Sequence, residues 1–298
     1  MAAAERVEAE RWGFSTPRPP EDISGQKMGR GGGPDAAADL CVLIPVYKDQ
    51  AGLAGTLEVL GAESHPFDIV VVDDGSPVPI ECAPRYGSHD VTLHRLDRNR
   101  GIEHALNAGL KTILIRGYRH VARLDCGDLP LPGRFERQEA YLDANPDVGM
   151  VGTWARCVND EGDYLFTLRF PTEHDRMLRH QRYVPALLHP TIMIRAEALR
   201  DVGLYSDRYK TAEDYDLFIR MGRRWRLANI PEVLTQYIVS ETGTTAAKRK
   251  RNLVSRMRIQ RDYFSWTDPH AWAGLARTAL FMAIPFGWLT AVKKRAWK

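Results

Sequence analysis

An apolar run ends in two carboxylates in the segment His120-Val121-Ala122-Arg123-Leu124-Asp125-Cys126-Gly127-Asp128. The sequence that follows, Leu129-Pro130-Leu131-Pro132-Gly133, cannot continue a sheet ladder, because proline has no amide hydrogen to donate. Residues 118–124 are therefore predicted to form a buried strand that ends at the carboxylates. In an open α/β sheet, ligands bind beyond the carboxyl ends of the strands. Two acids placed there suit a divalent cation and, through it, a phosphate, although a polar loop that only begins the next helix explains the pair equally well.

The composition of the chain is that of an ordinary soluble globular protein. Its 298 residues are 44% apolar and 27% charged, which suffices for one large domain or two. The net charge of +3 is too small to indicate nucleic-acid binding by itself. The four cysteines are far apart and form no CxxC pair, which argues against a zinc site and a secreted disulfide scaffold and favours reduced thiols in a cytosolic protein.

Residues 1–38 are predicted to form a disordered leader, since they are rich in Ala, Gly, Pro and charge and have no apolar period. Glu5, Arg6 and Glu8 stand where a signal peptide would need apolar residues, so no secretory signal is expected. The glycine-rich run at 29–33 precedes the first strand and is followed by no Lys-Ser/Thr pair, so we interpret it as a linker and not as a phosphate-binding loop.

Strand and helix patterns alternate from residue 40 onward. Apolar runs at 40–47, 67–73 and 91–96 predict buried strands, and helical spacing predicts helices at about 51–63 and from 101 to about 116. This order predicts a mainly parallel sheet with helices on both faces. Polar residues gather at the carboxyl ends of the strands, namely Tyr47, Asp73, Asp74, Asp97, Asn99, Asp125 and Asp128. Acids on two separate strand ends indicate one shared crevice better than they indicate unrelated turns.

The second half of the chain is expected to complete the sheet and to build the wall opposite the crevice. Its pattern predicts a helix after Pro132, a strand at 148–158, a hairpin turn to a strand at 164–169, an amphipathic helix at 172–183, a short strand at 191–195 and a helix at 196–201. The segment 211–220 then crowds acids into the first turn of a helix. The helix dipole favours acids there by about 0.3–1 kcal/mol each, so capping alone would explain them.

Taken together, these segments resemble the family 2 glycosyltransferases, over about residues 40–240. The resemblance is carried, in order, by Ile44-Pro45-Val46-Tyr47, Val72-Asp73-Asp74-Gly75-Ser76, Asn99-Arg100-Gly101 with Asn107, Arg123-Leu124-Asp125-Cys126-Gly127-Asp128 with Leu131-Pro132-Gly133-Arg134, His189-Pro190-Thr191, and Ala212-Glu213-Asp214-Tyr215-Asp216. It implies the GT-A fold, a Rossmann-like, mainly parallel mixed α/β sheet flanked by helices. We expect this domain over 39–243 and C-terminal helices over 244–298.

The resemblance also implies a nucleotide-sugar donor and a pocket for it. By likeness to the family, Asp73 or Asp74 hydrogen-bonds the base, and Pro45, Tyr47 and Asn99 line the same pocket.

The catalytic assignments come from the same resemblance. Asp125 is expected at the ribose and diphosphate, where Asp125 and Asp128 would hold Mg²⁺ or Mn²⁺. Asp214 is expected to be the general base that deprotonates the acceptor hydroxyl in an inverting single displacement. A cation neutralises the charge that develops on a diphosphate leaving group, and a positioned carboxylate contributes about 10²–10⁴-fold to the attack of an alcohol.

Two departures from the family pattern keep alternatives open. The family usually has acid, any residue, acid at the metal motif, whereas this chain has Gly127 at the second acidic position, with Asp128 one residue on. The segment Gln236-Tyr237-Ile238-Val239-Ser240 lacks the Arg and His that many relatives carry. A non-catalytic nucleotide-binding scaffold is one alternative. A sugar-phosphate nucleotidyltransferase is the other, although that class carries a glycine-rich loop where this chain has residues 45–48.

The C-terminal segment is basic and then apolar. Lys248-Arg249-Lys250-Arg251 begins a basic helix, and the apolar run 278–292 is broken by Pro285 and Gly287 and closed by Lys293-Lys294-Arg295. Fifteen helical residues fall short of a hydrocarbon core of roughly 30 Å, so we expect a helix in the membrane interface. A helix packed on the body or a dimer contact is the alternative, and no nucleic-acid partner is expected. A saccharide or lipid-linked acceptor of bacterial surface polysaccharide, met in the cytoplasm at the inner face of the membrane, would suit this location.

Overall fold

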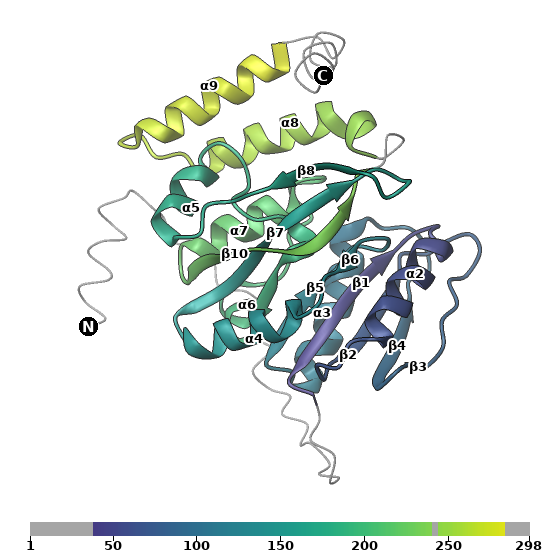
Figure 1. Ribbon diagram of the computed structural model, residues 1–298. Helices are drawn as coiled ribbons and strands as arrows, with labels where there is room; N and C mark the ends of the chain where they lie inside the picture. The colour runs from purple at the N-terminus through teal and green to yellow at the C-terminus, as the bar shows by residue number, and fades with distance from the viewer. Residues whose placement is uncertain (1–37, 240–243, 284–298) are drawn as a thin grey trace.

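The computed structural model describes residues 38–239 and 244–283, and the expected leader at 1–37 and the end of the apolar C-terminal run lie outside them (Figure 1). A mixed sheet of ten strands runs in the order β3-β4-β2-β1-β5-β9-β7-β10-β6, with β8 paired to β7. The strands are β1 (Leu40–Val46), β2 (Asp68–Asp73), β3 (Arg85–Tyr86), β4 (His89–Arg95), β5 (His120–Arg123), β6 (Leu129–Pro130), β7 (Val148–Val158), β8 (Tyr164–Leu168), β9 (Met193–Arg195) and β10 (Arg226–Ile238).

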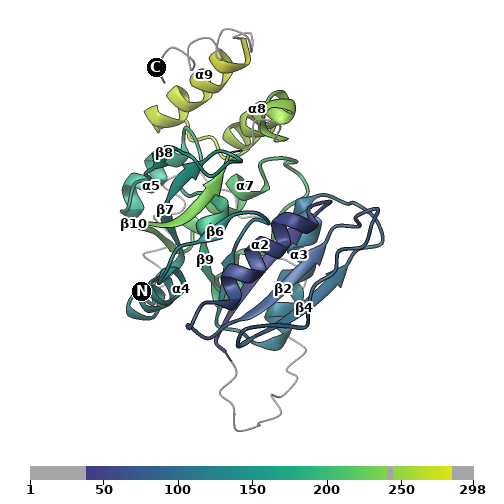
Figure 2. The ribbon, with the colours of Figure 1, turned by 45° about the vertical axis from the view of Figure 1, so that its right-hand side comes forward.

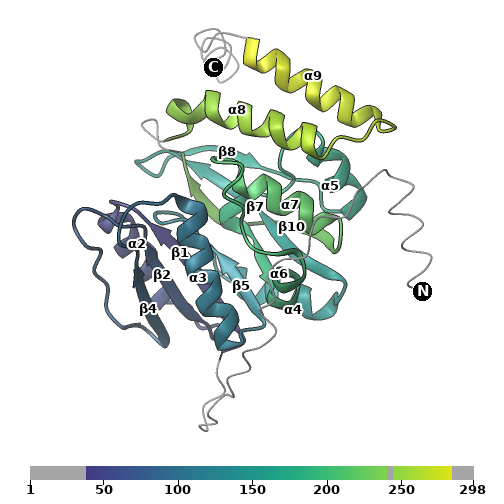
Figure 3. The same ribbon diagram turned by 180° about the vertical axis from the view of Figure 1, so that it is seen from behind.

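Helices cover both faces of this sheet. They are α2 (Gln50–Gly61), α3 (Ile102–Arg116), α4 (Arg134–Ala144), α5 (His174–Gln181), α6 (Ala196–Val202), α7 (Glu213–Gly222), α8 (Thr244–Asp262) and α9 (Pro269–Ala283), with a 3₁₀ turn at His189–Thr191. Figure 1 shows α2 and α4 in front of the sheet, and Figure 3, the view from behind, shows α3 and α6 on the opposite face. The expected mainly parallel mixed sheet flanked by helices is confirmed.

Strand β1 lies near the centre of the sheet, and its side chains contribute to the hydrophobic cores on both faces of the sheet. It pairs in parallel with β2 and β5, and all seven of its residues are buried. Because successive side chains of a strand point to opposite faces, Cys41 and Leu43 pack in the core under α3, while Val42 and Ile44 pack in the core under α2. A continuous apolar run is what a strand covered on both faces requires.

The sequence pattern missed one long strand, and it was wrong about Leu129 and Pro130, which were expected to leave the sheet but form β6, paired antiparallel with β10. β10 pairs in parallel with β7 along almost its whole length, but its ladder shifts register between Ile230 and Val233. Pro231 and Glu232 are exposed at this irregularity, where a missing amide costs no ladder hydrogen bond. The short strand expected at 191–195 begins instead with the 3₁₀ turn, so that β9 contains only three residues.

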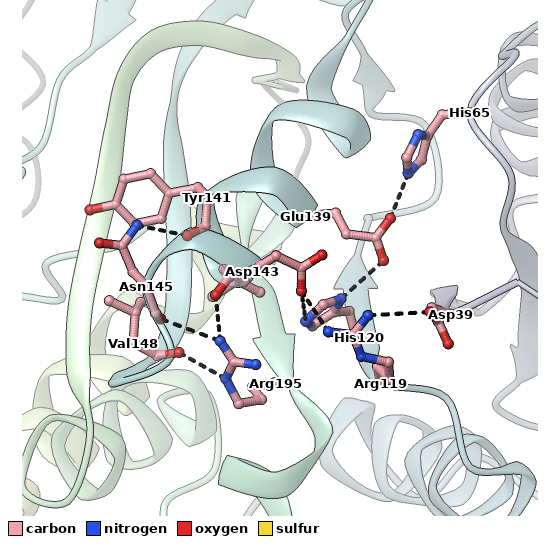
Figure 4. Close-up of polar contacts among 11 residues, drawn as sticks. Asp39, His65, Arg119, His120, Glu139, Tyr141, Asp143, Asn145, Val148 and Arg195 are labelled. Atoms are coloured by element: carbon pink, nitrogen blue, oxygen red, sulfur yellow. Dashed lines mark hydrogen bonds and ion pairs between the residues drawn. The ribbon is translucent and has the colours of Figure 1, made fainter.

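A polar cluster fixes α4 against the start of β5 (Figure 4). The Glu139 carboxylate accepts hydrogen bonds from His65 Nε2 at 2.7 Å and His120 Nδ1 at 3.0 Å. Arg119 donates to Asp143 at 2.7 Å. These contacts lie at the end of β5 opposite to Asp125 and join α4, β5 and the loop before β2.

The C-terminal helices pack as a pair on the domain beside α5 and α7 (Figures 1 and 2). No helix in the described ranges is both long enough and apolar enough to cross a bilayer.

Replacing Glu139 by Gln should lower the free energy of unfolding by about 1–3 kcal/mol, the usual cost of losing a hydrogen bond to a charged group. Burial alone would raise the pKa of Glu139, but the hydrogen bonds from His120 and His65 outweigh it and hold the pKa below 4.5. A depressed carboxyl pKa contributes stability above the unfolded value, and this stability is lost as pH falls through the folded value. The difference in stability between the wild type and E139Q, measured by urea denaturation, should therefore shrink below about pH 4.5. Glu58→Gln, on the exposed face of α2, is the control; equal losses in the two variants would contradict the role of the cluster.

Candidate active site

The carboxyl ends of three neighbouring parallel strands meet at one edge of the sheet. Val46 of β1 is in register with Asp73 of β2, and Leu43 of β1 is in register with Arg123 of β5. Tyr47, Asp74 and the loop from Leu124 to Asp128 therefore leave the sheet side by side. This is the edge at which open α/β sheets bind ligands.

Asp73 and Asp74 both hold loops in place with their carboxylates. Asp73 is 1% exposed and accepts from the amides of Ser76 at 2.8 Å and Ile80 at 3.3 Å and from Arg95 Nη1 at 2.9 Å. Asp74 is buried and accepts from the amides of Arg100 and Gly101 at 2.9 and 3.0 Å. The two side chains thus hold the loops at this edge of the sheet, and the contact of either one with a base remains a prediction.

The other residues expected around the base differ in their exposure. Tyr47 is 41% exposed and Asn99 is exposed, so both can reach a ligand, whereas Pro45 is buried in β1. Lys48 follows Tyr47 with a positive φ of 60°, and its amide donates to the Ser76 hydroxyl at 3.0 Å. The turn after β1 is therefore tied directly to the turn after β2.

Arg123, the last residue of β5, places a buried positive charge among the acids. It is 2% exposed, and its Nη2 contacts Asp125 Oδ1 at 2.5 Å. Burial lowers the pKa of Arg123, but the charge of Asp125 and its hydrogen bond outweigh this, so the net pKa is raised. The Nε and Nη1 atoms of Arg123 are buried without a partner in the structure. The charge of the same guanidinium also acts on Asp128, Glu213 and Asp214, where it lowers the pKa against the larger effect of burial.

Asp128 offers an unpartnered oxygen next to Asp125. Its Oδ1 accepts from the amide of Ile238 in β10 at 2.9 Å, while its Oδ2 is buried without a partner. Burial and then the charge of Asp125 raise the pKa of Asp128 well above its ordinary value. Two repelling carboxylates with a free oxygen suit a cation, and Mg²⁺ is commonly bound by one or two carboxylates together with substrate phosphates. Gly127, with a φ of 96°, forms the turn between the two acids.

Arg134, at the start of α4, supports this loop from below. It is fully buried, donates from Nη2 to the Arg123 carbonyl at 2.8 Å and from Nε to Gln138 at 3.0 Å. Gln138 in turn donates to the carbonyls of Val151 and Thr191. Burial, opposed by the charge of Asp128, lowers the pKa of Arg134 to about 9. The network joins β5, β7 and the 3₁₀ turn beneath the acids.

The expected general base begins helix α7 on the other side of Arg123. Asp214 is half-buried, and its Oδ1 accepts from the amide of Tyr215 at 2.7 Å. Burial raises the pKa of Asp214, while the Tyr215 amide and the charge of Arg123 lower it, and the net direction is upward. Glu213 beside it is 6% exposed and has an unpartnered Oε2, and burial followed by the charge of Asp214 raises its pKa to about 8. A carboxylate with a raised pKa is a stronger base than an exposed one.

Tyr205 connects the acids of α7 with those after β5. Its ring is 5% exposed, and burial raises its pKa, with the charges of Asp214, Glu213 and Asp125 adding to the effect. His189 Nε2 lies 2.7 Å from the Tyr205 hydroxyl. Asn107 exchanges hydrogen bonds with the backbone of Tyr205 at 2.8 and 2.9 Å. Asp125 and Asp214, which lie far apart in the sequence, thus both act on the pKa of Tyr205, and the charge of Arg123 opposes them.

Sequence reasoning did not single out Arg123, Glu213 or Tyr205. Arg123 stands at the end of an apolar run, directly before the carboxylates. Because a buried arginine needs an acidic partner, this position could have predicted an ion pair with those carboxylates. Glu213 precedes the expected base. Nothing in the pattern around Tyr205 marks it.

Comparison with known proteins gives the class of this chain. Residues 41–203, more than half of the chain, match the profile described as Glycosyl transferase family 2. The O-antigen biosynthesis glycosyltransferase WbnJ of Escherichia coli is 31% identical over 132 residues, which are 43% of this chain and 50% of WbnJ. The amylovoran biosynthesis glycosyltransferase AmsE of Erwinia amylovora is 31% identical over 201 residues, 65% of this chain and 73% of AmsE. The chain belongs to glycosyl transferase family 2, as the order of its motifs indicated.

Solved structures share the fold at low sequence identity. TarS of S. aureus, residues 1–349 in complex with UDP-GlcNAc, has a TM-score of 0.60 at 16% identity, covering 80% of this chain and 71% of that one. The mannosyltransferase PcManGT of Pyrobaculum calidifontis, in complex with GDP-Man and Mn²⁺, has a TM-score of 0.56 at 18% identity, covering 99% and 89%. The expected GT-A fold is confirmed.

Gly75 is the glycine on which the rim of the crevice depends. Its φ is 66°, and an added Cβ would lie 2.2 Å from the backbone carbon of Arg98. Gly75→Ala should therefore lower the free energy of unfolding by more than about 1 kcal/mol and displace the loop that carries Asn99. Gly55→Ala is the matched control, since a Cβ at this position in α2 meets nothing within 4 Å and alanine should stabilise the helix by roughly 0.5–1 kcal/mol. Thermal denaturation of both variants measures the effect, and a neutral G75A would show that the turn tolerates a side chain.

Proposed function

We propose that this protein transfers one sugar from a nucleoside-diphosphate sugar to an acceptor hydroxyl with inversion at the anomeric carbon. One observation carries the proposal, namely that the buried guanidinium of Arg123 pairs with Asp125 Oδ1 at 2.5 Å and that its charge also acts on Asp214 at the start of α7. A donor diphosphate at Asp125 and an acceptor hydroxyl at Asp214 would then face each other across a short distance. Membership of glycosyl transferase family 2 supports this reaction class.

The donor would lie along the edge formed by β1, β2 and β5. We propose that the base lies over the loops fixed by Asp73 and Asp74, with Tyr47 and Asn99 at its border and Pro45 below. The diphosphate would then reach Asp125 and Asp128. The free Asp128 Oδ2 supports a divalent cation there, and the solved mannosyltransferase of similar fold was obtained with GDP-Man and Mn²⁺. The cation, when bound, neutralises charge on the departing diphosphate.

Asp214 would accept the proton of the acceptor hydroxyl while that oxygen attacks the anomeric carbon. Its raised pKa makes it a better base, and the positive charge of Arg123 favours its ionised form. The bond to the nucleoside diphosphate breaks as the new glycosidic bond forms, so a single displacement inverts the configuration.

The second candidate is a nucleotide-binding scaffold that has lost transfer activity. Gly127 in place of an acid at the metal motif favours it, as does the absence of Arg and His from residues 236–240. This scaffold would bind the donor with the same pocket but leave it intact. The sugar-phosphate nucleotidyltransferase alternative has less support, because β1 is followed by Tyr47 and Lys48 and not by a glycine-rich loop.

The acceptor is proposed to be a saccharide or a lipid-linked saccharide of a bacterial surface polysaccharide. The names of WbnJ and AmsE, which refer to O-antigen and amylovoran biosynthesis, support this proposal. Within it, residues 39–243 would form the catalytic domain and residues 244–298 would hold the protein at the cytoplasmic face of the membrane. The protein would then meet an acceptor carried by a lipid.

Asp214→Asn should lower kcat for sugar transfer by about 10²–10⁴-fold and leave donor binding unchanged, because the amide cannot accept the proton. Transfer to a saccharide acceptor and calorimetric binding of the donor measure the two quantities separately. Asp175→Asn is the matched control, since Asp175 is also an acid in the first turn of a helix but is exposed on α5. Wild-type turnover by D214N would remove the general-base assignment, and donor binding by a wild type that neither transfers nor hydrolyses would favour the scaffold.

The cognate donor should stabilise the protein against heat, and Mn²⁺ should increase the effect. A donor at a hundredfold excess over its Kd should add about 2.7 kcal/mol to the free energy of unfolding. A thermal-shift screen of UDP-, GDP- and dTDP-sugars with and without Mn²⁺ would identify the base. In Asp128→Asn the additional shift from Mn²⁺ should disappear, and a full Mn²⁺ effect in this variant would exclude Asp128 as a ligand.

A further inference from the structure

Helix α9 lies outermost in the protein and is docked through a narrow strip of small residues. Its buried residues are Ala271, Gly274 and Thr278, which fall on one side of the helix at spacings of three and four. Gly274 approaches so closely that an added Cβ would lie 1.9 Å from the Arg182 carbonyl oxygen. α9 runs along α8 in all three ribbon views (Figures 1 to 3). This docking determines which side of α9 points away from the protein.

The opposite side of α9 is apolar and exposed. Trp272, Ala276, Ala279, Leu280 and Ala283 follow each other at helical spacing, and all are exposed. Trp272 is 48% and Leu280 60% exposed. A continuous apolar face of this kind on a soluble domain marks an interaction site. We call these five residues the outer face of α9.

An aromatic group extends the outer face at the turn between α8 and α9. Trp266 is 77% exposed and meets Trp272 edge-to-face at a centroid distance of 5.3 Å. Phe264 contacts both rings, at 5.2 Å from Trp266 and 4.8 Å from Trp272. Tryptophan is the residue preferred where one side of a surface is apolar and the other is wet, as at a membrane interface.

The exposed charged residues of α8, the helix that packs against α9, are mostly positive. Among the described side chains of α8, the exposed charged residues are Lys250, Arg251, Arg258, Arg261 and Asp262. Asp262 is neutralised by Arg208 and Arg261, with which it forms ion pairs at 2.9 and 3.2 Å. The charged residue of α9 itself is Arg277. An apolar strip on a helix that packs against this basic helix complements a surface that is apolar within and anionic at its rim.

We propose that the outer face of α9, together with Trp266, lies in the interfacial layer of an anionic lipid bilayer, with the exposed basic residues of α8 at the headgroups. The proposal rests on the membrane contact in the proposed function and specifies the face that makes it. Beyond the described residues, the sequence continues with Phe286, Trp288 and Leu289 and then with Lys293-Lys294-Arg295, which has the same combination of apolar and basic residues. Vesicle binding requires neither donor nor acceptor, so it can fail while sugar transfer stands, and the reverse is also true.

Cosedimentation of the full chain with sucrose-loaded vesicles tests the proposal. The wild type should pellet with vesicles that contain phosphatidylglycerol and stay in the supernatant with pure phosphatidylcholine. Leu280→Glu places a charge in the outer face and should weaken partitioning by about tenfold or more. Ile115→Glu is the matched control, because Ile115 is an aliphatic residue on helix α3 that is 58% exposed, far from α9 in the ribbon. Its partitioning should equal that of the wild type.

A second variant and a second measurement distinguish weaker membrane binding from misfolding of the variant. Ala276→Glu changes the same face by a different residue and should weaken binding in the same direction, and the circular dichroism melting curves of both variants should match that of the wild type. Wild-type partitioning of both variants, or equal binding to neutral vesicles, would overturn the proposal. A wild-type dimer that Leu280→Glu dissociates in size-exclusion chromatography would overturn it as well, since a second copy of the chain would then cover the face.

Discussion

The buried guanidinium of Arg123 is the charge on which the candidate site depends. A buried ion without a partner costs several kcal/mol, so the ion pair with Asp125 at 2.5 Å is needed to keep this residue at the end of β5. Asp125 and Asp128 come from the loop that follows the strand, while Glu213 and Asp214 come from α7. The charge of Arg123 thus acts on two segments that lie about ninety residues apart in the sequence, and these are the segments at which we propose the diphosphate and the acceptor.

The acids in turn depend on the charge of Arg123. Without Arg123, burial and mutual repulsion would raise the pKa values of Asp128, Glu213 and Asp214 further, and neutral carboxyls would neither bind a cation nor accept a proton. Buried side-chain atoms of Arg123, Asp128 and Glu213 are without a partner among the described residues. Such atoms are rare in folded proteins and concentrate where a ligand completes the hydrogen bonding.

Much of this architecture could be predicted from the sequence because it rests on local patterns. β1 and β2 are continuous apolar runs, and parallel strands covered on both faces leave no other composition possible. The positions of Asp73, Asp74 and Asp125 at strand ends followed from the same runs. The roles of these residues did not, because the carboxylates of Asp73 and Asp74 turn inward to backbone amides, and no periodicity tells an acid that binds its own loop from one that binds a ligand.

What escaped prediction depends on tertiary contacts. β10 contains Pro231 and Glu232 at its irregular centre and buries Asn229, which donates to the carbonyls of Pro171 and Ala186, so its pattern is not that of a strand. Arg134 is fully buried by a network with Gln138 and the Arg123 carbonyl, although arginine is normally exposed. Apart from Gln138, these partners belong to other elements of the fold, and a single-sequence pattern contains no information on them.

The contact between α8 and α7 has a consequence for the orientation of the whole molecule. The Tyr263 hydroxyl after α8 donates to Asp216 Oδ1 at 2.7 Å, and Asp216 is two residues from Asp214 on α7. The C-terminal helices are therefore joined by this hydrogen bond to the helix that carries Asp214, the proposed base. A partner that binds these helices would therefore also fix the orientation of the candidate site relative to that partner. With that orientation fixed, the protein would select among chemically identical hydroxyl groups by the distance of each one from the bound partner.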